Sequence, residues 1–271
     1  MEQEDYLELS EDGKTVISCQ KDHQGAVVIP DSVTEIGDEA FWGCENLTSI
    51  EIPKGVEVIR ENTFAACTSL TSVEIPDSVT QIRYRAFSGC TSLTSLKIPE
   101  SVKVIEPYAF AACTSLKEII VEKGNPNYCS RDGVLYTKDM SILVAVPGGR
   151  KSFVIPDSVI MIGNCALFGC ENLISIEIPN SVTEIGRCAF DRCENLTSIK
   201  IPDSVTEIGD SAFYHCSSLI EVHLQHKTPI DLSNAFRGNH KTNVTFHVPK
   251  GTSAAYRNCE HYKDFKEIIE E

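Results

Sequence analysis

Residues 29–51 read IPDSVTEIGDEAFWGCENLTSIE, and close copies of this stretch recur along the chain. The Ile-Pro pair that opens it returns every 23 residues, at Ile52-Pro53, Ile75-Pro76 and Ile98-Pro99, and the register resumes at 155, 178 and 201. The shared unit is Ile-Pro-x-Ser-Val-x-x-Ile-Gly-x-x-Ala-Phe-x-x-Cys-x-x-Leu-x-x-Ile-x. Because the Val, Ile, Phe, Cys and Leu columns keep one step across seven units, the sequence predicts a repeat protein.

The apolar spacing within one unit indicates how it folds. Ile50 and Ile52 alternate with polar neighbours, which is strand spacing, and Pro53 ends that strand because it has no N–H to donate. Val56 and Ile59 mark a second inward-facing segment, and the Ala-Phe-x-x-Cys stretch is compatible with one short turn or helical turn. No single unit can bury its own apolar stripe. Stacked units would share one core and pair their strands in parallel.

These motifs resemble the BspA-like leucine-rich repeats of bacterial surface proteins and some parasitic protists. The resemblance covers roughly residues 26–250, and it is specific because Ile-Pro-x-Ser-Val and Ala-Phe-x-x-Cys recur together at a fixed step. It implies an α/β fold: a curved, right-handed leucine-rich-repeat solenoid with a parallel β-sheet on the concave face and short turns or helical turns on the convex side. It also implies roles in adhesion, co-aggregation and binding of host proteins.

Breaks in the register suggest how a single solenoid domain, residues 1–271, is organised. The expected parts are an N-terminal cap hairpin at 1–29, repeats 1–4 at 30–122, an irregular hairpin unit at 123–156, repeats 5–8 at 157–249 and a C-terminal cap helix at 250–271. The irregular unit has two apolar runs around Thr137–Met140, which favours a hairpin that continues the sheet. The alternative for 123–156 is a linker between two domains.

The C-terminal parts depart from the consensus. Phe236 keeps the aromatic register in a degraded eighth unit, where Asn239 replaces the cysteine. Val244, Phe246 and Val248 predict a last strand that is offset by one residue. The apolar spacing of 253–271 favours an amphipathic helix capped by Thr252 or Ser253.

Residues that flank the strand isoleucines point away from the core and form a hydroxyl-rich, sparsely charged face. Such a face suits an extended or convex macromolecule better than a small substrate. The alternative is that Ser and Thr simply suit strands. The candidate partner-binding residues are Ser49, Glu51, Ser72, Glu74, Ser95, Lys97, Glu118, Ser175, Glu177, Ser198, Lys200, Glu221 and His223.

The chain contains 12 cysteines, of which seven form the repeated column. Their regularity favours small buried apolar side chains, and no Cys-x-x-Cys spacing indicates zinc. Cys165 and Cys188 are one repeat apart, so a disulfide between them is an open alternative.

The sequence offers no nucleophile or phosphate-loop motif, so we expect no enzyme, no catalytic residue and no cofactor. His223 and His226 have ligand-like spacing within a histidine-rich C-terminal quarter. We interpret them as exposed polar residues rather than as a metal site.

The formal net charge of −15 disfavours nucleic acid and anionic membranes as partners. No apolar run is long enough to insert into a membrane, and the acidic N-terminus is unlike a signal peptide. The leading hypothesis is a non-catalytic protein-binding module of a cell-surface or secreted adhesin-like protein, with a host extracellular-matrix or bacterial surface protein as partner. The alternative is an intracellular scaffold or structural spacer, which the cysteine content also fits.

Overall fold

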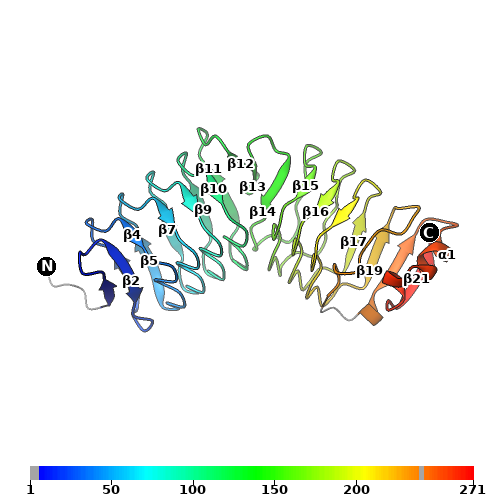
Figure 1. The fold of residues 1–271 in the computed structure, drawn as a ribbon, viewed down its shortest axis with the longest axis horizontal. Helices are drawn as coiled ribbons and strands as arrows, with labels where there is room; N and C mark the ends of the chain where they lie inside the picture. Colours follow the sequence, from blue (N-terminus) through cyan, green and yellow to red (C-terminus); the bar gives the residue numbers. More distant parts are fainter. Residues whose placement is uncertain (1–5, 238–240) are drawn as a thin grey trace. The chain divides into compact units, whose positions relative to one another are not determined.

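The computed structural model describes residues 6–237 and 241–271. They form two compact units: the first contains residues up to Asp139 together with Pro147–Gly149, and the second contains Met140–Val146 and Arg150–Glu271. In each unit short strands of successive repeats stack side by side, as Figure 1 shows. No helix within the described ranges is long and apolar enough to cross a membrane.

The first unit carries two parallel ladders, because each repeat supplies two strands. The Ile50 position builds the longer ladder, in which β5 lies between β3 and β7. The Ile59 position builds the shorter one, in which β8 lies between β6 and β10. The strands at the Ile50 position are β3 (Gly25–Val28), β5 (Leu47–Glu51) and β7 (Ser72–Glu74), followed by β9 (Ser95–Ile98) and β11 (Glu118–Val121), which pair with each other in a separate two-stranded sheet. Those at the Ile59 position are β6 (Val58–Ile59), β8 (Gln81–Ile82) and β10 (Val104–Ile105), whereas β4 (Glu35–Ile36) holds the same repeat position but belongs to another sheet.

The second unit repeats this plan with the same parallel register. Ile199 pairs with Val222 and Ile162 with Ile185, each one repeat apart. Glu221 pairs with Thr245, which confirms that the last repeat strand is offset by one residue. The strands are β14 (Ile142–Ala145), β15 (Met161–Ile162), β16 (Glu184–Ile185) and β18 (Glu207–Ile208), and β17 (Ser198–Ile201), β19 (Glu221–Leu224), β20 (Thr245–Val248) and β21 (Glu267–Glu270).

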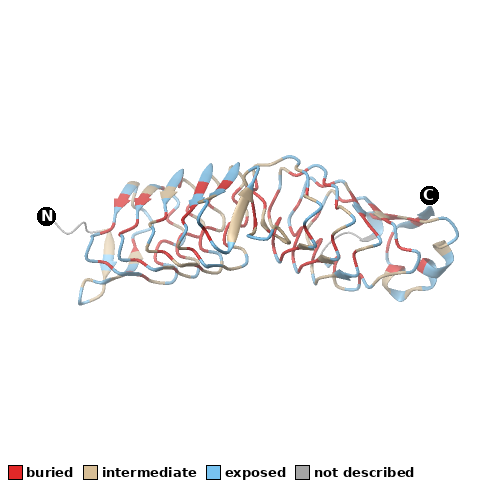
Figure 2. Cartoon of the chain, turned by 90° about the horizontal axis from the view of Figure 1, so that it is seen from above, coloured by how far each residue is buried: buried red, intermediate tan, exposed pale blue. Residues whose placement is uncertain are grey.

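The predicted apolar columns form the core, and buried residues recur along every coil in Figure 2. Phe64 and Phe87 are fully buried and stack with ring centroids 5.3 Å apart. Phe213 and Phe236 stack at 4.9 Å in the second unit, so the eighth repeat keeps the aromatic position. Asn239, predicted to replace the cysteine there, lies outside the described residues.

The Ala-Phe-x-x-Cys stretch forms turns and no helical turn in the described repeats. The second repeat gives the reason. Asn62 and Ala66, two residues before and two after Phe64, have φ angles of 52° and 59°. Left-handed residues on both sides of the phenylalanine cannot belong to a right-handed helix, so the chain reverses sharply around each ring.

The repeated cysteines are buried and hydrogen bonded between neighbouring coils. The Cys90 thiol donates to the Phe64 carbonyl over 3.2 Å, and Cys113 and Cys216 make the same contact one coil back over 3.1 and 3.0 Å. No disulfide joins two cysteines within the described residues. The Cys165 thiol, considered above as a partner for Cys188, donates to the Arg187 carbonyl over 3.7 Å.

The N-terminal segment contains an antiparallel hairpin of β1 (Leu7–Leu9) and β2 (Thr15–Cys19), and β2 also pairs in parallel with β4. Both apolar runs of the 123–156 segment are strands, as β13 (Val134–Thr137) and β14. The sequence missed β12 (Tyr128–Arg131), which pairs antiparallel with β13. Asp132 and Gly133 join the two strands with φ angles of 52° and 73°. A type I′ turn needs a positive φ at both of these positions.

The predicted C-terminal helix over 253–271 is wrong for most of its length. Only α1 (Ser253–Asn258) is α-helical, followed by the 3₁₀ turn η2 (Glu260–Tyr262), and the chain then forms β21 in parallel with β20. The open edge of β20 offers backbone hydrogen bonds that an exposed helix cannot use. The predicted side-chain cap is also absent, because the Thr252 hydroxyl donates to the Pro249 carbonyl over 2.6 Å. The Glu270 carboxylate instead accepts the Ser253 N–H over 3.0 Å.

Candidate functional site

The outward side of the strands at the Ile50 position carries one line of side chains in each unit, which we call the charged column. Its members occupy one repeat position, and register pairs such as Glu51 with Glu74 and Lys200 with His223 align them. Isolated bridges extend the alignment from Val154 through Glu177 to Lys200. In the first unit the column is Val28, Glu51, Glu74, Lys97 and Ile120, and in the second it is Val154, Glu177, Lys200, His223, His247 and Ile269.

A second column lies beside it, two residues earlier on each strand and therefore on the same face. Ser49 pairs with Ser72, Ser95 with Glu118, and Ser198 with Glu221. All the residues predicted to bind a partner belong to these two columns, and each is exposed or half-buried. The two columns together are the strand face.

Exposed aliphatic side chains stand at both ends of each charged column. Val28 is 57% exposed and Ile120 43% in the first unit, while Val154 is 86% exposed and Ile269 38% in the second. A large apolar side chain in water gains free energy when a partner covers it. The residues predicted from the sequence to bind a partner are all polar or charged, although the spacing that places Glu51 on this face applies equally to these four aliphatic side chains.

A groove of about 1000 Å³ runs along the first unit's charged column, where the strands turn into the Ile-Pro segment. Glu51, Glu74 and Lys97 line it, together with Asp31 and Asp77 from the turns. The groove is therefore predominantly acidic.

Lys97 does little to offset the negative charge of Glu51 and Glu74, because its ammonium is already paired with another carboxylate. Its ammonium lies 2.5 Å from the Glu122 carboxylate. The hydrogen bond from Lys97 lowers the pKa of Glu122, and the same bond raises the pKa of Lys97. The charge of Lys97 is thus directed to Glu122, and Glu51 and Glu74 are left as the carboxylates facing a partner in this line.

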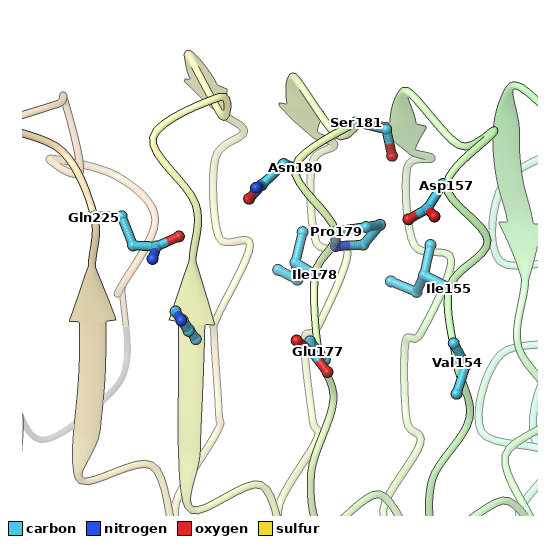
Figure 3. Close-up of a pocket in the computed structure, with 10 residues that line it drawn as sticks. Val154, Ile155, Asp157, Glu177, Ile178, Pro179, Asn180, Ser181 and Gln225 are labelled. Carbon is cyan, nitrogen blue, oxygen red and sulfur yellow. The ribbon is translucent and has the colours of Figure 1, made fainter.

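The second unit has a pocket of about 710 Å³ at the equivalent place, shown in Figure 3. Val154, Ile155 and Asp157 line it from one coil and Glu177, Ile178 and Pro179 from the next. Lys200 and Gln225 complete the wall. It combines an exposed aliphatic side chain with two carboxylates and one ammonium, so it can accept an apolar side chain and pair with charges of either sign.

The hydroxyl-rich character of the surface has a partly structural origin. The Thr71 hydroxyl donates to the Thr48 carbonyl over 3.1 Å, and Thr183 donates to the Ile160 carbonyl over 3.2 Å. These threonines bond the coil before them, as expected if Thr suits strands. Thr71 and Thr183 lie outside the two columns of the strand face, so their hydroxyls do not define that face.

The histidines are arranged differently from the sequence interpretation. His226 is buried, with its Nε2 atom 2.7 Å from the Val205 carbonyl oxygen, so it does not act as an exposed polar residue. Its neighbour in sequence, His223, faces outward and stacks on His247 at 4.3 Å. Sequence reading missed this pair because the two residues are 24 positions apart, and only the one-residue offset of the last strand places them opposite each other.

Comparison with known proteins agrees with this geometry. The model of the BspA type leucine rich repeat region matches residues 19–130 and 149–263, with six copies. The chain belongs to the BspA-type leucine-rich-repeat family. The interruption between the two matched ranges lies within the irregular 123–156 segment and contains β13 and β14. No curated protein matches the chain.

Solved structures of several other proteins are similar to this chain. A leucine rich cell surface protein from Faecalibacterium prausnitzii A2-165 is 34% identical with a TM-score of 0.71, over 89% of this chain and 64% of that one. A leucine-rich repeat protein from Eubacterium ventriosum is 25% identical with a TM-score of 0.67, over 96% and 81%. The pneumococcal vaccine antigen PcpA shares the fold at 20% identity and a TM-score of 0.63, over 97% and 82%.

Proposed function

We propose that this BspA-type chain is a non-catalytic protein-binding module of a cell-surface or secreted adhesin-like protein. Its strand face contacts a protein partner. The observation that carries the proposal is the charged column, in which aligned carboxylates and lysines stand between exposed aliphatic side chains in each unit. Charged groups beside exposed apolar area are the composition of a protein interface, where the apolar part supplies affinity and the charges supply specificity.

The dimensions of the strand face favour a protein over a small ligand. Neighbouring strands lie ~4.8 Å apart, so a column of five side chains extends roughly 20 Å. A column of that length presents many weak contacts in a line, which suits an extended segment or a convex surface. The proposed partner is a host extracellular-matrix protein or a bacterial surface protein, consistent with adhesion and co-aggregation.

Location at the cell surface rests on the relatives. The Faecalibacterium protein is described as a cell surface protein, and this chain spans 64% of it. Surface exposure would bring the strand face into contact with proteins outside the cell. The competing proposal is an intracellular scaffold or structural spacer, which is favoured by the many buried thiols without a disulfide in the described residues. A signal peptide encoded in frame upstream of the Met1 codon would contradict the intracellular-scaffold proposal.

Charge reversal on the strand face tests the proposal. Binding of the purified chain is measured against immobilised matrix proteins and whole partner bacteria, for wild type and for a double variant, Glu51→Lys with Glu74→Lys. Glu57→Lys is the matched control, because Glu57 is exposed but lies outside the strand face. A second comparison sets Val154→Asp against Ile160→Asp, since both side chains are exposed aliphatics of the second unit.

We expect the strand-face variants to reduce binding at least tenfold and the controls to leave it within twofold. A buried interfacial charge pair that is broken costs about 2–5 kcal/mol, which is more than tenfold in affinity. Equal binding by wild type and every strand-face variant, with circular dichroism showing them folded, would refute the proposed surface.

A further inference from the structure

The second unit's charged column ends in a cluster of metal-binding side chain types. His223 of β19 and His247 of β20 are register partners on adjacent parallel strands (the β19 region is labelled in Figure 1). Their rings stack at 4.3 Å between centroids with an interplanar angle of 16°. Glu221 lies two residues before His223 on the same strand and therefore on the same face. Three side chains that can bind a metal thus share one small area of surface.

A fourth side chain reaches the cluster from beyond β21. The backbone N–H of Glu271 donates to the Val248 carbonyl over 3.0 Å, which fixes that residue beside β20. Its carboxylate Oε1 lies 3.0 Å from Nδ1 of His223, and its Oε2 lies 3.5 Å from Nδ1 of His247. One carboxylate therefore faces the same nitrogen of both imidazoles.

The contacts of the other atoms leave room for an ion. The Nε2 atom of His223 lies 3.9 Å from Oε2 of Glu221. The ligand atoms offered by Glu221, His223 and His247 all lie within 4.8 Å of one another. A tetrahedral ion with bonds of about 2.0–2.1 Å holds its ligand atoms roughly 3.3 Å apart. Binding therefore requires side-chain rotations that bring the three atoms from within 4.8 Å to that separation.

We propose that Glu221, His223 and His247 form a Zn²⁺ site on the strand face. Glu271 is a positioning residue: its carboxylate accepts a hydrogen bond from the Nδ1–H of His223 and faces the Nδ1 atom of His247, which favours the tautomers that present Nε2 to the metal. Two imidazoles and one carboxylate are a donor set that zinc favours, whereas Ca²⁺ and Mg²⁺ require oxygen ligands.

Electrostatics support a divalent cation at this place. Glu221 and Glu271 bring two carboxylates to the cluster, so with neutral imidazoles a Zn²⁺ ion balances the local charge. Lys200 is the register partner of His223 on the other side and brings one opposing charge. Its exposed, flexible side chain can turn toward Glu177, the carboxylate aligned with it on the next coil.

Three protein ligands leave one coordination position of a tetrahedral ion for water or for a donor from another molecule. Because the site belongs to the charged column, that position faces the surface proposed to bind protein. The zinc site stands independently of the proposed function, since it requires only the four side chains of this cluster.

Titration of the reduced full chain with ZnCl₂ tests the site, with isothermal titration calorimetry for affinity and elemental analysis for stoichiometry. We expect one Zn²⁺ per chain, and no heat from CaCl₂ or MgCl₂. The double variant His223→Asn with His247→Asn is expected to bind at least a hundredfold more weakly, and Glu221→Gln at least tenfold. His261→Asn is the matched control, because His261 also contacts a carboxylate, that of Asp231, but lies outside the cluster.

Two further readouts separate the site from other zinc-binding groups. Co²⁺ substitution reports the ligands, and a spectrum without thiolate charge-transfer bands is expected. Glu271→Gln is expected to weaken Zn²⁺ binding while leaving the Co²⁺ band pattern unchanged, as a positioning role requires. The proposal is overturned by absent zinc binding, by thiolate bands, or by zinc binding that survives the double histidine variant. Unchanged far-ultraviolet circular dichroism shows that each variant is folded.

Discussion

Replacing Cys90 tests how the repeated cysteines hold neighbouring coils together. Cys90 is completely buried, and its thiol donates to the Phe64 carbonyl over 3.2 Å. That carbonyl also accepts the Cys67 backbone N–H over 3.2 Å, so it keeps one partner when the thiol is removed. The loss of stability in Cys90→Ala therefore comes mainly from removing a buried sulfur atom, because the Phe64 carbonyl is not left without a hydrogen-bond donor.

The magnitude follows from burial and volume. Removing one buried atom of methylene size costs ~0.8 kcal/mol of transfer free energy. The void it leaves, about one methylene in volume, costs roughly another 0.6 kcal/mol at ~24 cal/mol per Å³. The weak S–H bond adds a few tenths, so Cys90→Ala is expected to lower the free energy of unfolding by about 1.5–2 kcal/mol.

Serine distinguishes apolar packing from hydrogen bonding at this position. Its shorter C–O bond draws the donor away from the Phe64 carbonyl and buries a hydroxyl, and a poorly satisfied buried hydroxyl costs about 1–3 kcal/mol. Cys90→Ser is therefore expected to be less stable than Cys90→Ala. Urea unfolding followed by circular dichroism measures both, with the half-buried Cys259→Ala as a control expected to change stability by less than ~0.5 kcal/mol.

The reasoning is refuted if Cys90→Ser matches wild type, since the thiol would then act as a hydrogen-bonding group rather than as apolar filling. It is refuted as well if Cys90→Ala is neutral, since no void would then form. Burial also raises the pKa of the Cys113 thiol to about 12, so this thiol is expected to stay protonated. A thiol reagent should find all 12 cysteines after denaturation, and fewer would reveal a disulfide.

Three further predictions follow from buried groups. Asn125→Ala removes the hydrogen bonds that the side-chain amide donates to the Pro99 and Val102 carbonyls, so it should lower the free energy of unfolding in urea by more than ~2 kcal/mol. The exposed Asn127→Ala is the control and should lose less than half of that, and equal losses in the two variants would contradict the prediction. Burial raises the pKa of Asp191 from 3.8 to about 6, so this carboxyl stabilises the fold at low pH and loses that contribution as pH rises through about 6. Asp191→Asn should therefore gain ~1–2 kcal/mol on wild type between pH 4.5 and 7.5, and parallel stability curves would refute it. Phe213→Ala should lower the free energy of unfolding by about 3–5 kcal/mol, and Trp42→Ala, at an exposed position, by under ~1 kcal/mol. A similar loss in both variants would contradict the importance of the stacked phenylalanine core.

The repeat core was predictable because its signal is redundant. Val33, Val56 and Val79 occupy one column, and each is fully buried. Residues that recur at a fixed step occupy the same environment in every coil, so assigning one member of a column to the core assigns all of them. The outward positions followed from the same periodicity, and this is why the predicted strand-face residues are all at least partly accessible.

Segments outside the repeat carry no such redundancy. Tyr256, Tyr262, Phe265 and Ile268 fit helical spacing, yet the chain becomes strand β21 from Glu267 because the edge of β20 is available as a template. Tertiary pairing decides between the two states there, and local pattern does not.

The candidate metal cluster was hidden for a related reason. His223 and His226 are close in sequence, but His226 is held by the Val205 carbonyl inside the protein. His247 and Glu271 come beside His223 only through the register of β19, β20 and β21. Register across three strands cannot be read from the spacing of two residues.

Site-specific photo-crosslinking tests most directly the central claim that the strand face contacts a protein partner. A photoreactive amino acid is placed at Ser72 or Ser175 on the strand face, and at Glu57 or Thr206 away from it, all exposed positions. Each variant is irradiated while bound to the matrix protein or bacterial surface protein that gives the strongest binding. Crosslinks from Ser72 and Ser175 alone are the predicted result. Crosslinks from Glu57 or Thr206, with none from the two serines, would contradict the account.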